Sequence, residues 1–209
     1  MEVRERILQK ANELYFRFGI RSITMDEIAA QCGMSKKTIY QFFEDKDALV
    51  EAVFNTEIDM SQGQCLHTRG RSDNAVHEIF LAMENVMELF DSMHASILFD
   101  LQKHHPKTYL KLEHHKSAFL LSITRENILR GQQEGLYRKE VDAEIIAYMR
   151  LETIFLTITR QPEMFSKSQF SPSRILQEMT DHYLHGLATA KGLLLIEKHK
   201  QERTKNKIV

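Results

Sequence analysis

Apolar residues recur along the chain with the spacing of α-helices. The first stripe stands at i, i+4, i+8, i+11 and i+15, and Gly19 follows it. Its members are Val3, Ile7, Ala11, Leu14 and Phe18. Sustained alternation of apolar and polar residues, which would indicate strands, does not occur, and only three prolines and eight glycines interrupt the pattern. The sequence therefore predicts an all-α fold.

Residues 24–43 predict two short helices separated by a tight turn. Thr24 and Glu27 have the spacing of a capping box, which starts a helix at Met25. Gly33 can take the left-handed conformation that ends this helix, and Ser35 is placed to cap the next one. The pattern is that of a helix-turn-helix. The inward residues are expected to be Ile28, Ala29, Ile39 and either Phe42 or Phe43.

The second of these helices presents polar residues outward, as a DNA recognition helix does. We expect base contacts from Lys36, Lys37, Thr38 and Gln41, with Thr24 and Ser35 at the helix starts beside them. Tyr40 is expected to offer its hydroxyl to a phosphate. Lys46 follows Asp45, the predicted cap of the next helix, where a cation opposes the helix dipole unless it binds a phosphate. The alternative is an ordinary solvated face.

These residues resemble the N-terminal domain of tetracycline-repressor (TetR) family regulators. The matching positions are Thr24 to Ala30, Gly33-Met34-Ser35, Thr38-Ile39-Tyr40, Phe43 and Lys46-Asp47-Ala48-Leu49. The position of Lys37 is often glycine in that family, so the lysine adds a cation at a base-reading position. The resemblance implies a bacterial transcriptional regulator, not an enzyme. It would have an N-terminal helix-turn-helix domain and a C-terminal helical bundle for ligand binding and dimerisation.

Beyond residue 50 the pattern predicts further helices. A helix from about Lys46 to Met60 leads into a polar, glycine-containing stretch, 61–73, that we expect to be a flexible boundary. The later helices are expected over 76–93, 97–101, 107–134 and 145–158, the last ending near Pro162, and then from Ser171-Pro172 toward Ile196. The predicted domains are 1–48 for DNA binding, 49–200 for ligand binding and dimerisation, and 201–209 as a basic, disordered tail.

The helix over 145–158 carries more apolar surface than one core requires. Leu151, Ile154, Phe155, Leu156 and Ile158 cover much of its circumference. We therefore expect part of it to meet a second subunit. The resemblance implies a homodimer formed by the last two long helices as a four-helix bundle. Such a dimer reads two half-sites about 34–36 Å apart, which predicts a pseudo-palindromic operator of double-stranded DNA.

The middle helices hold candidates for an apolar ligand pocket. These are Met83, Met87, Phe90, Phe99, Phe119 and Met149, with Glu152 and Arg150 placed to orient a polar ligand. For any single one of them, an ordinary core residue is the favoured interpretation. The resemblance implies a small-molecule effector that releases a repressor from DNA, with the fourth helix as the lever. A DNA-binding regulator without a ligand is the alternative.

Two histidine pairs raise a rival class, a metal sensor or metal-dependent enzyme. His104-His105 and His114-His115 are about ten residues apart with Pro106 between them, and no His-Glu-x-x-His frame accompanies them. We interpret them as solvated helix histidines. Ser-His-Asp frames, phosphate loops and dinucleotide fingerprints are likewise missing from the sequence, so we expect no catalytic residues, metal or cofactor.

Composition adds little about the partner. The chain has 209 residues, 43% of them apolar, and a net charge of −1. Positions 1–50 contain eight Lys or Arg and eight Asp or Glu, so DNA binding must depend on the placement of charge. Cys32 and Cys65 lack CxxC spacing, and no apolar run approaches the roughly 18 residues of a membrane span. We expect a soluble, reduced, cytoplasmic protein that contacts no membrane, with Cys32 in the core more readily than acting as a redox sensor.

Overall fold

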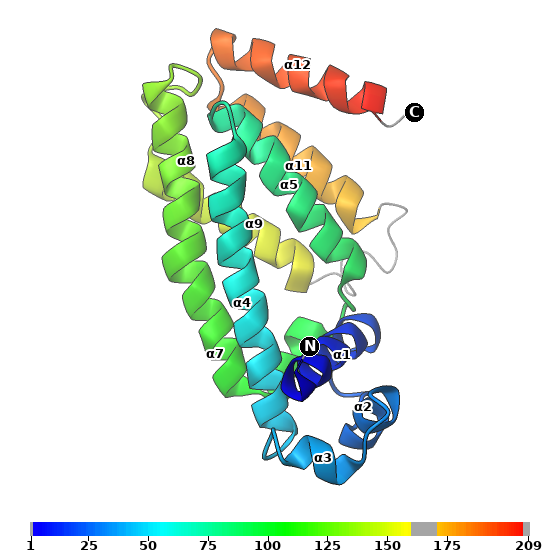
Figure 1. The fold of residues 1–209 in the computed structure, drawn as a ribbon. Coiled ribbons are helices and arrows are strands. Elements are labelled where there is room, and N and C mark those ends of the chain that lie inside the picture. Colours follow the sequence, from blue (N-terminus) through cyan, green and yellow to red (C-terminus); the bar gives the residue numbers. More distant parts are fainter. Residues whose placement is uncertain (1, 160–170, 207–209) are drawn as a thin grey trace. The chain divides into compact units, whose positions relative to one another are not determined.

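The computed structural model describes residues 2–159 and 171–206, and within them all regular elements are helices (Figure 1). The all-α prediction is confirmed. The elements are α1 (Val3–Phe18), α2 (Met25–Gln31), α3 (Lys36–Tyr40), α4 (Lys46–Arg71), α5 (Ala75–Ser92), α6 (Ile97–His104), α7 (Pro106–His114), the π-helix η1 (His115–Leu120), α8 (Leu121–Gln133), α9 (Ala143–Thr159), α11 (Pro172–Leu187) and α12 (Ala190–Asn206).

The chain forms two compact units. Unit 1 comprises the described residues up to 62 together with Ser92–His115, and unit 2 comprises Gly63–Asp91 and the described residues from 116 onward. Each unit has its own buried apolar residues. In unit 1 they come from all its helices except α7 and include Ile7, Tyr15, Ile28, Ile39, Leu49, Phe54, Ile97 and Leu101. Helix α4 contributes residues to both units, so it is a covalent link between them.

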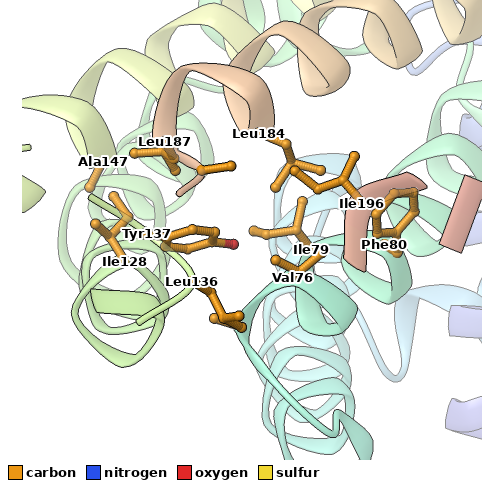
Figure 2. Packing of buried hydrophobic residues seen from close by; sticks show 12 residues of the cluster. Val76, Ile79, Phe80, Ile128, Leu136, Tyr137, Ala147, Leu184, Leu187 and Ile196 are labelled. Carbon is orange, nitrogen blue, oxygen red and sulfur yellow. The ribbon is translucent and has the colours of Figure 1, made fainter. Parts of the chain in front are cut away.

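Unit 2 is built around one apolar cluster drawn from α5, α8, α9, α11, α12 and the loop after α8 (Figure 2). The loop residue Tyr137 lies at its centre and is 1% exposed. A Cβ at Gly131 of α8 would overlap the Tyr137 ring, so this helical position requires glycine. The loop also pairs with the chain after α11, because Arg138 N donates to Leu187 O at 2.8 Å and Thr189 N to Leu136 O at 2.9 Å.

Helix α4 does not end where the sequence predicted. It continues through Gly63 and Gly70 to Arg71, so the predicted break in the helix over 61–73 is wrong for most of its length, whereas the division between the two units, after residue 62, does fall in this range. The added turns are held by unit 2, since Arg69 pairs with Glu126 of α8. Tertiary contacts of this kind outweigh the roughly 1 kcal/mol that each helical glycine costs.

The C-terminal region also differs from the prediction. The expected single helix from Ser171 breaks after Leu187, where the backbone pairs with the loop around Tyr137, and resumes as α12. Helix α12 then continues to Asn206, so the predicted disordered tail is wrong for 201–206. Arg203 pairs with Glu84 of α5 at 3.1 Å, which holds α12 against α5. The expected helix over 107–134 is interrupted by the π-helix η1. Pro162 and residues 207–209 lie outside the described residues.

Candidate nucleic-acid interface

The predicted caps of the helix-turn-helix are present. Thr24 Oγ1 accepts from Glu27 N at 3.2 Å, and Glu27 Oε2 accepts from Thr24 N at 2.7 Å. The hydrogen bonds that Glu27 Oε2 accepts from Thr24 N and Thr24 Oγ1 lower the pKa of this carboxyl. Gly33 has φ of 64°, in the left-handed region that ends α2. Ser35 Oγ accepts from Thr38 N at 3.1 Å and starts α3. The local sequence therefore fixes both helices and the turn between them.

Helix α3 presents one continuous exposed face. Lys37, Tyr40 and Gln41 are exposed on it, and Ile39 is buried against the rest of unit 1. Thr38 is partly buried, and its hydroxyl lies 2.9 Å from that of Ser35. Lys37 makes no ion pair with any described residue. Its ammonium thus needs no rearrangement to meet a base or phosphate.

Lys36 is engaged within unit 1. Its Nζ lies 2.7 Å from Asp26 Oδ2 of α2, and this contact raises the pKa of the lysine. Both side chains are about half exposed or more, so the pair contributes little stability. It nevertheless directs the Lys36 ammonium toward α2. Lys36 must leave Asp26, or both must move, before it can contact a base as predicted.

Lys46 has a different environment from the one the sequence indicated. Its Nζ donates to Ile20 O at 2.7 Å and to Ile23 O at 2.6 Å, both in the loop between α1 and α2. The side chain is partly buried, and burial lowers its pKa. The ammonium therefore holds this loop against the start of α4. This placement differs from the predicted one, in which Lys46 extends to a DNA phosphate.

A buried carboxylate that the sequence analysis missed also holds this loop. Asp100 of α6 is 4% exposed, and its Oδ2 accepts from Arg21 N at 3.2 Å and from Ser96 Oγ at 3.0 Å. Lys46 and Asp100 thus position the loop that precedes α2. A buried acid cannot be recognised from apolar periodicity, because its partner is a backbone amide 79 residues earlier in the chain.

The structure also resolves the choice between the two phenylalanines after α3. Phe43 is 4% exposed and belongs to the core, whereas Phe42 is 42% exposed beside the recognition helix. Phe42 and Phe43 stand three and four residues after Ile39, and helical spacing allows either to face the core, so the choice depended on the tertiary structure. Phe42 adds an apolar group to the candidate interface, suited to contact a thymine methyl or a sugar.

The interpretation of the histidine pairs as solvated is wrong for one member of each pair, because His105 and His115 have largely buried side chains with protein partners. His105 Nδ1 lies 2.8 Å from Asp47 Oδ1, and His115 is buried with its Nε2 3.2 Å from Ser61 Oγ. Within 2–159 and 171–206 there is no group of three or more residues able to hold a metal ion. Among the same residues, no helix is both long and apolar enough to cross a bilayer.

The predicted pocket residues do not form one group. Met83 and Phe90 of α5 are buried in unit 2, whereas Phe99 and Met149 are each 56% exposed. Phe99 belongs to unit 1. These two are surface residues, so the structure does not support them as the lining of an enclosed cavity.

Three further residues of the predicted pocket belong to unit 2. Met87 and Phe119 are partly buried. Glu152 Oε1 pairs with Lys116 Nζ at 2.8 Å, and that ammonium lies 4.7 Å from the centre of the Phe155 ring. The Glu152 carboxylate is therefore already neutralised by the Lys116 ammonium of η1.

Comparisons with known proteins agree with this geometry. Residues 7–53 match the family model described as bacterial regulatory proteins, tetR family. Over 187 residues the chain is 26% identical to the uncharacterized HTH-type transcriptional regulator YvaF of Bacillus subtilis (strain 168), which covers 88% of this chain and 94% of that protein.

Solved structures share the fold. A putative transcriptional regulator from Saccharomonospora viridis, in complex with choline, superposes with a TM-score of 0.71 at 18% identity, covering 89% of this chain and 97% of that one. The fatty acid degradation regulator FadR from Bacillus halodurans gives 0.68 at 14% identity, covering 86% and 93%. Identities this low show a common fold.

Proposed function

Since the chain belongs to the tetR family of bacterial regulatory proteins and is a DNA-binding transcriptional regulator, we propose that it is a homodimeric repressor released from its operator by a small molecule. The observation that carries the DNA-binding part is the exposed face of α3 on a doubly capped helix-turn-helix. In this proposal residues 1–48 bind DNA, and residues 49–200 bind the effector and dimerise.

We assign base reading to Lys37, Thr38 and Gln41, with Lys36 joining after it leaves Asp26. Lys37 carries the most weight, because it is exposed and makes no ion pair within the described residues. A lysine can donate to the O6 and N7 acceptors of guanine in the major groove. Thr24, Ser35 and Tyr40 are assigned to phosphate or sugar contacts, which set the register of the helix without reading sequence.

The dimer is assigned to α9 and α11. Helix α9 has buried residues on one side, and on the other an exposed apolar stripe at i, i+3, i+4 and i+11. The stripe consists of Ile145, Tyr148, Met149 and Leu156, each at least 45% exposed. A stripe of four large, exposed apolar residues supports a subunit interface, since monomeric proteins rarely leave large contiguous apolar patches in water. Met149 is better accounted for here than in a ligand pocket.

We place the effector in the interior of unit 2, near Met83, Met87 and Phe90 of α5. Phe119 and Glu152, which the sequence analysis assigned to the pocket, stay part of this proposal. The relative from Saccharomonospora viridis is in complex with choline, which supports small-molecule binding by a protein of this fold. Effector binding shifts the population between two states of the dimer. The free energy of this shift cannot exceed the difference between the effector's binding free energies for the two states.

Helix α4 is the proposed lever. Lys46, at its start, holds the loop before α2, and Arg69, near its end, pairs with Glu126 in unit 2. A change in the position of this helix therefore acts on contacts in both units.

Operator binding tests the proposal. The purified protein is titrated with DNA flanking its own gene and with scrambled DNA of equal length over a salt series, and the stoichiometry is measured by sedimentation. A specific complex with an even number of subunits supports a dimeric regulator. Equal, salt-labile affinity for both DNAs, or a monomer at micromolar concentration, contradicts it.

A further inference from the structure

Unit 2 contains a buried guanidinium that has no acidic partner among the described residues. Arg150 of α9 is 9% exposed. Its Nη2 donates to Thr180 Oγ1 of α11 at 2.7 Å, and its Cζ lies 4.8 Å from the centre of the Tyr183 ring. These are a neutral acceptor and an aromatic face, so neither cancels the charge. Burial accordingly lowers the pKa of Arg150. An ion buried without a counter-ion strongly destabilises a fold.

Two tyrosine hydroxyls beside this guanidinium also lack partners. The hydroxyl oxygens of Tyr137 and Tyr183 are buried, and neither has a hydrogen-bond partner within 2–159 and 171–206. Figure 2 shows the Tyr137 oxygen directed toward α5, at Val76 and Ile79. The Tyr183 ring lies against the Arg150 guanidinium, and both tyrosines are near enough to act on the pKa of Arg150. Three polar groups with unused donors therefore gather in one interior region.

The other charges in this region are already paired. Glu78 of α5 is 5% exposed and acts electrostatically on Tyr137 and Tyr183. However, Arg130 Nη1 lies 3.0 Å from Glu78 Oε2, and Arg130 Nε lies 2.7 Å from Glu134 Oε1. Glu78 is thus neutralised by Arg130 and is not the counter-ion of Arg150.

A second subunit does not supply the missing anion by way of the α9 stripe. Arg150 lies on the inner side of α9 with Ala147 and Leu151, which are buried, whereas Ile145 and Met149 of the stripe are exposed. Water could satisfy the tyrosine hydroxyls, but it would leave the charge uncompensated. The donor set therefore fits an anion that enters the interior of unit 2.

We propose that Arg150, Thr180, Tyr137 and Tyr183 bind the carboxylate of an amphipathic organic acid inside unit 2. This inference rests on the proposed function, since it names the chemical class of the effector. A monocarboxylate matches the single positive charge, whereas a phosphate ester would bring nearly two negative charges. A guanidinium can also donate to both carboxylate oxygens at once, and the tyrosine hydroxyls supply further donors.

The apolar part of the acid is placed among methionines between α5, α9 and α11. Met87 Sδ of α5 accepts from Gln177 Nε2 at 3.6 Å, and Met179 Sδ of α11 accepts from Thr157 Oγ1 at 3.5 Å. Thioether sulfurs are weak acceptors, and methionine side chains adapt readily, so these contacts yield to an entering chain at small cost. Thr157, which contacts Met179, stands two helical turns after Arg150 on the same buried face of α9, so this apolar region lies on the side of α9 that carries the proposed carboxylate donor.

The test uses the full-length protein with decanoate as probe, and decanamide and decylammonium as probes of equal length without the negative charge. Binding is measured by calorimetry and by thermal melting. For the wild type, we expect decanoate to raise Tm by several degrees at saturation and the two controls to leave it nearly unchanged. Arg150→Met should weaken decanoate on the order of 100-fold, and Tyr183→Phe about threefold to tenfold. Arg174→Met of α11, an exposed position, should bind decanoate like the wild type.

A readout without ligand makes the test independent of the probe. Because Arg150→Met removes a buried charge without a counter-ion, its Tm without ligand should equal or exceed that of the wild type. Glu163 is the carboxylate of the segment outside the described residues, so Glu163→Gln tests it as a protein counter-ion of Arg150. The inference would be overturned if Arg150→Met and Glu163→Gln each lowered Tm by the same several degrees and the double variant lowered it no further. Equal Tm shifts by decanoate and decanamide would overturn it as well.

Operator affinity of the same samples separates this inference from the proposed function. Specific DNA binding without charge-selective decanoate binding rejects the carboxylate site and keeps the regulator. Arg150-dependent decanoate binding without specific DNA binding keeps the carboxylate site and rejects the proposed regulator function. Binding of both ligands with no effect of one on the other keeps the site but rejects its role in release.

Discussion

Replacing Lys46 with methionine distinguishes two roles for this side chain. Methionine retains most of the aliphatic stem but removes the ammonium that donates to Ile20 O and Ile23 O at 2.7 and 2.6 Å. A hydrogen bond from a charged donor contributes about 1.5 to 3 kcal/mol. Because Lys46 is only partly buried, we take roughly half of that for each bond. The expected loss of stability is about 1.5 to 3 kcal/mol, or about 3 to 12 °C in Tm.

The assay combines urea unfolding of the full chain with hydrogen exchange of the peptide that covers the loop between α1 and α2. Lys46→Met should unfold at lower urea and exchange faster in this loop. Under conditions where it remains folded, the slope of its DNA affinity against salt should match that of the wild type. Lys37→Met is the matched control. It should leave stability within about 0.5 kcal/mol, since its side chain is exposed, but alter base preference.

One result would refute the loop-holding role. If Lys46→Met keeps the wild-type unfolding midpoint and its salt slope falls by about one unit, the ammonium contacts a DNA phosphate, as the sequence alone predicted. Faster loop exchange with an unchanged salt slope supports the placement in the structure.

Three further predictions concern packing, assembly and pH. Gly131→Ala should lower Tm by at least 5 °C, about 2 kcal/mol, because its Cβ would overlap Tyr137, whereas Gly186→Ala, where a Cβ meets open space, should be neutral or stabilising by calorimetry. Met149→Glu should yield monomers by sedimentation; a persisting dimer would place the interface elsewhere. Burial lowers the pKa of His115 below its ordinary value of 6.5, so protonation favours the unfolded chain. Stability should therefore fall as pH drops from about 6.5 through the folded-state pKa, and His115→Gln should flatten this loss; an unchanged pH profile would contradict it.

The helix-turn-helix could be predicted from sequence because its determinants are local. Thr24 contacts Glu27 three residues away, and Ser35 contacts Thr38 at the same spacing. Gly33 needs only its own backbone freedom to take φ of 64°. Interactions of this range can be recognised from spacing alone, so the caps and the inward position of Ile39 agreed with expectation.

The partners of Lys46, Asp100 and Arg150 could not be predicted in this way. Lys46 meets carbonyls 23 and 26 residues earlier in the chain, and Asp100 meets an amide 79 residues earlier. Periodicity indicates which side of a helix is apolar. It does not indicate which distant residue will contact a given polar side chain. The length of α4 was missed for the same reason, since contacts with α8 outweigh its glycines.

By itself, the sequence determined the all-α class, the two capped helices of the helix-turn-helix and the resemblance to the tetR family, because capping, periodicity and turn chemistry act within one or two helical turns. Only the tertiary structure decided that Lys46 holds a loop, that Phe42 and Met149 reach the surface, and that Arg150 is buried without an acidic partner among the described residues. These outcomes depend on which helices pack together. The resulting burial then sets the desolvation free energy of each polar group, and therefore whether that group needs a partner.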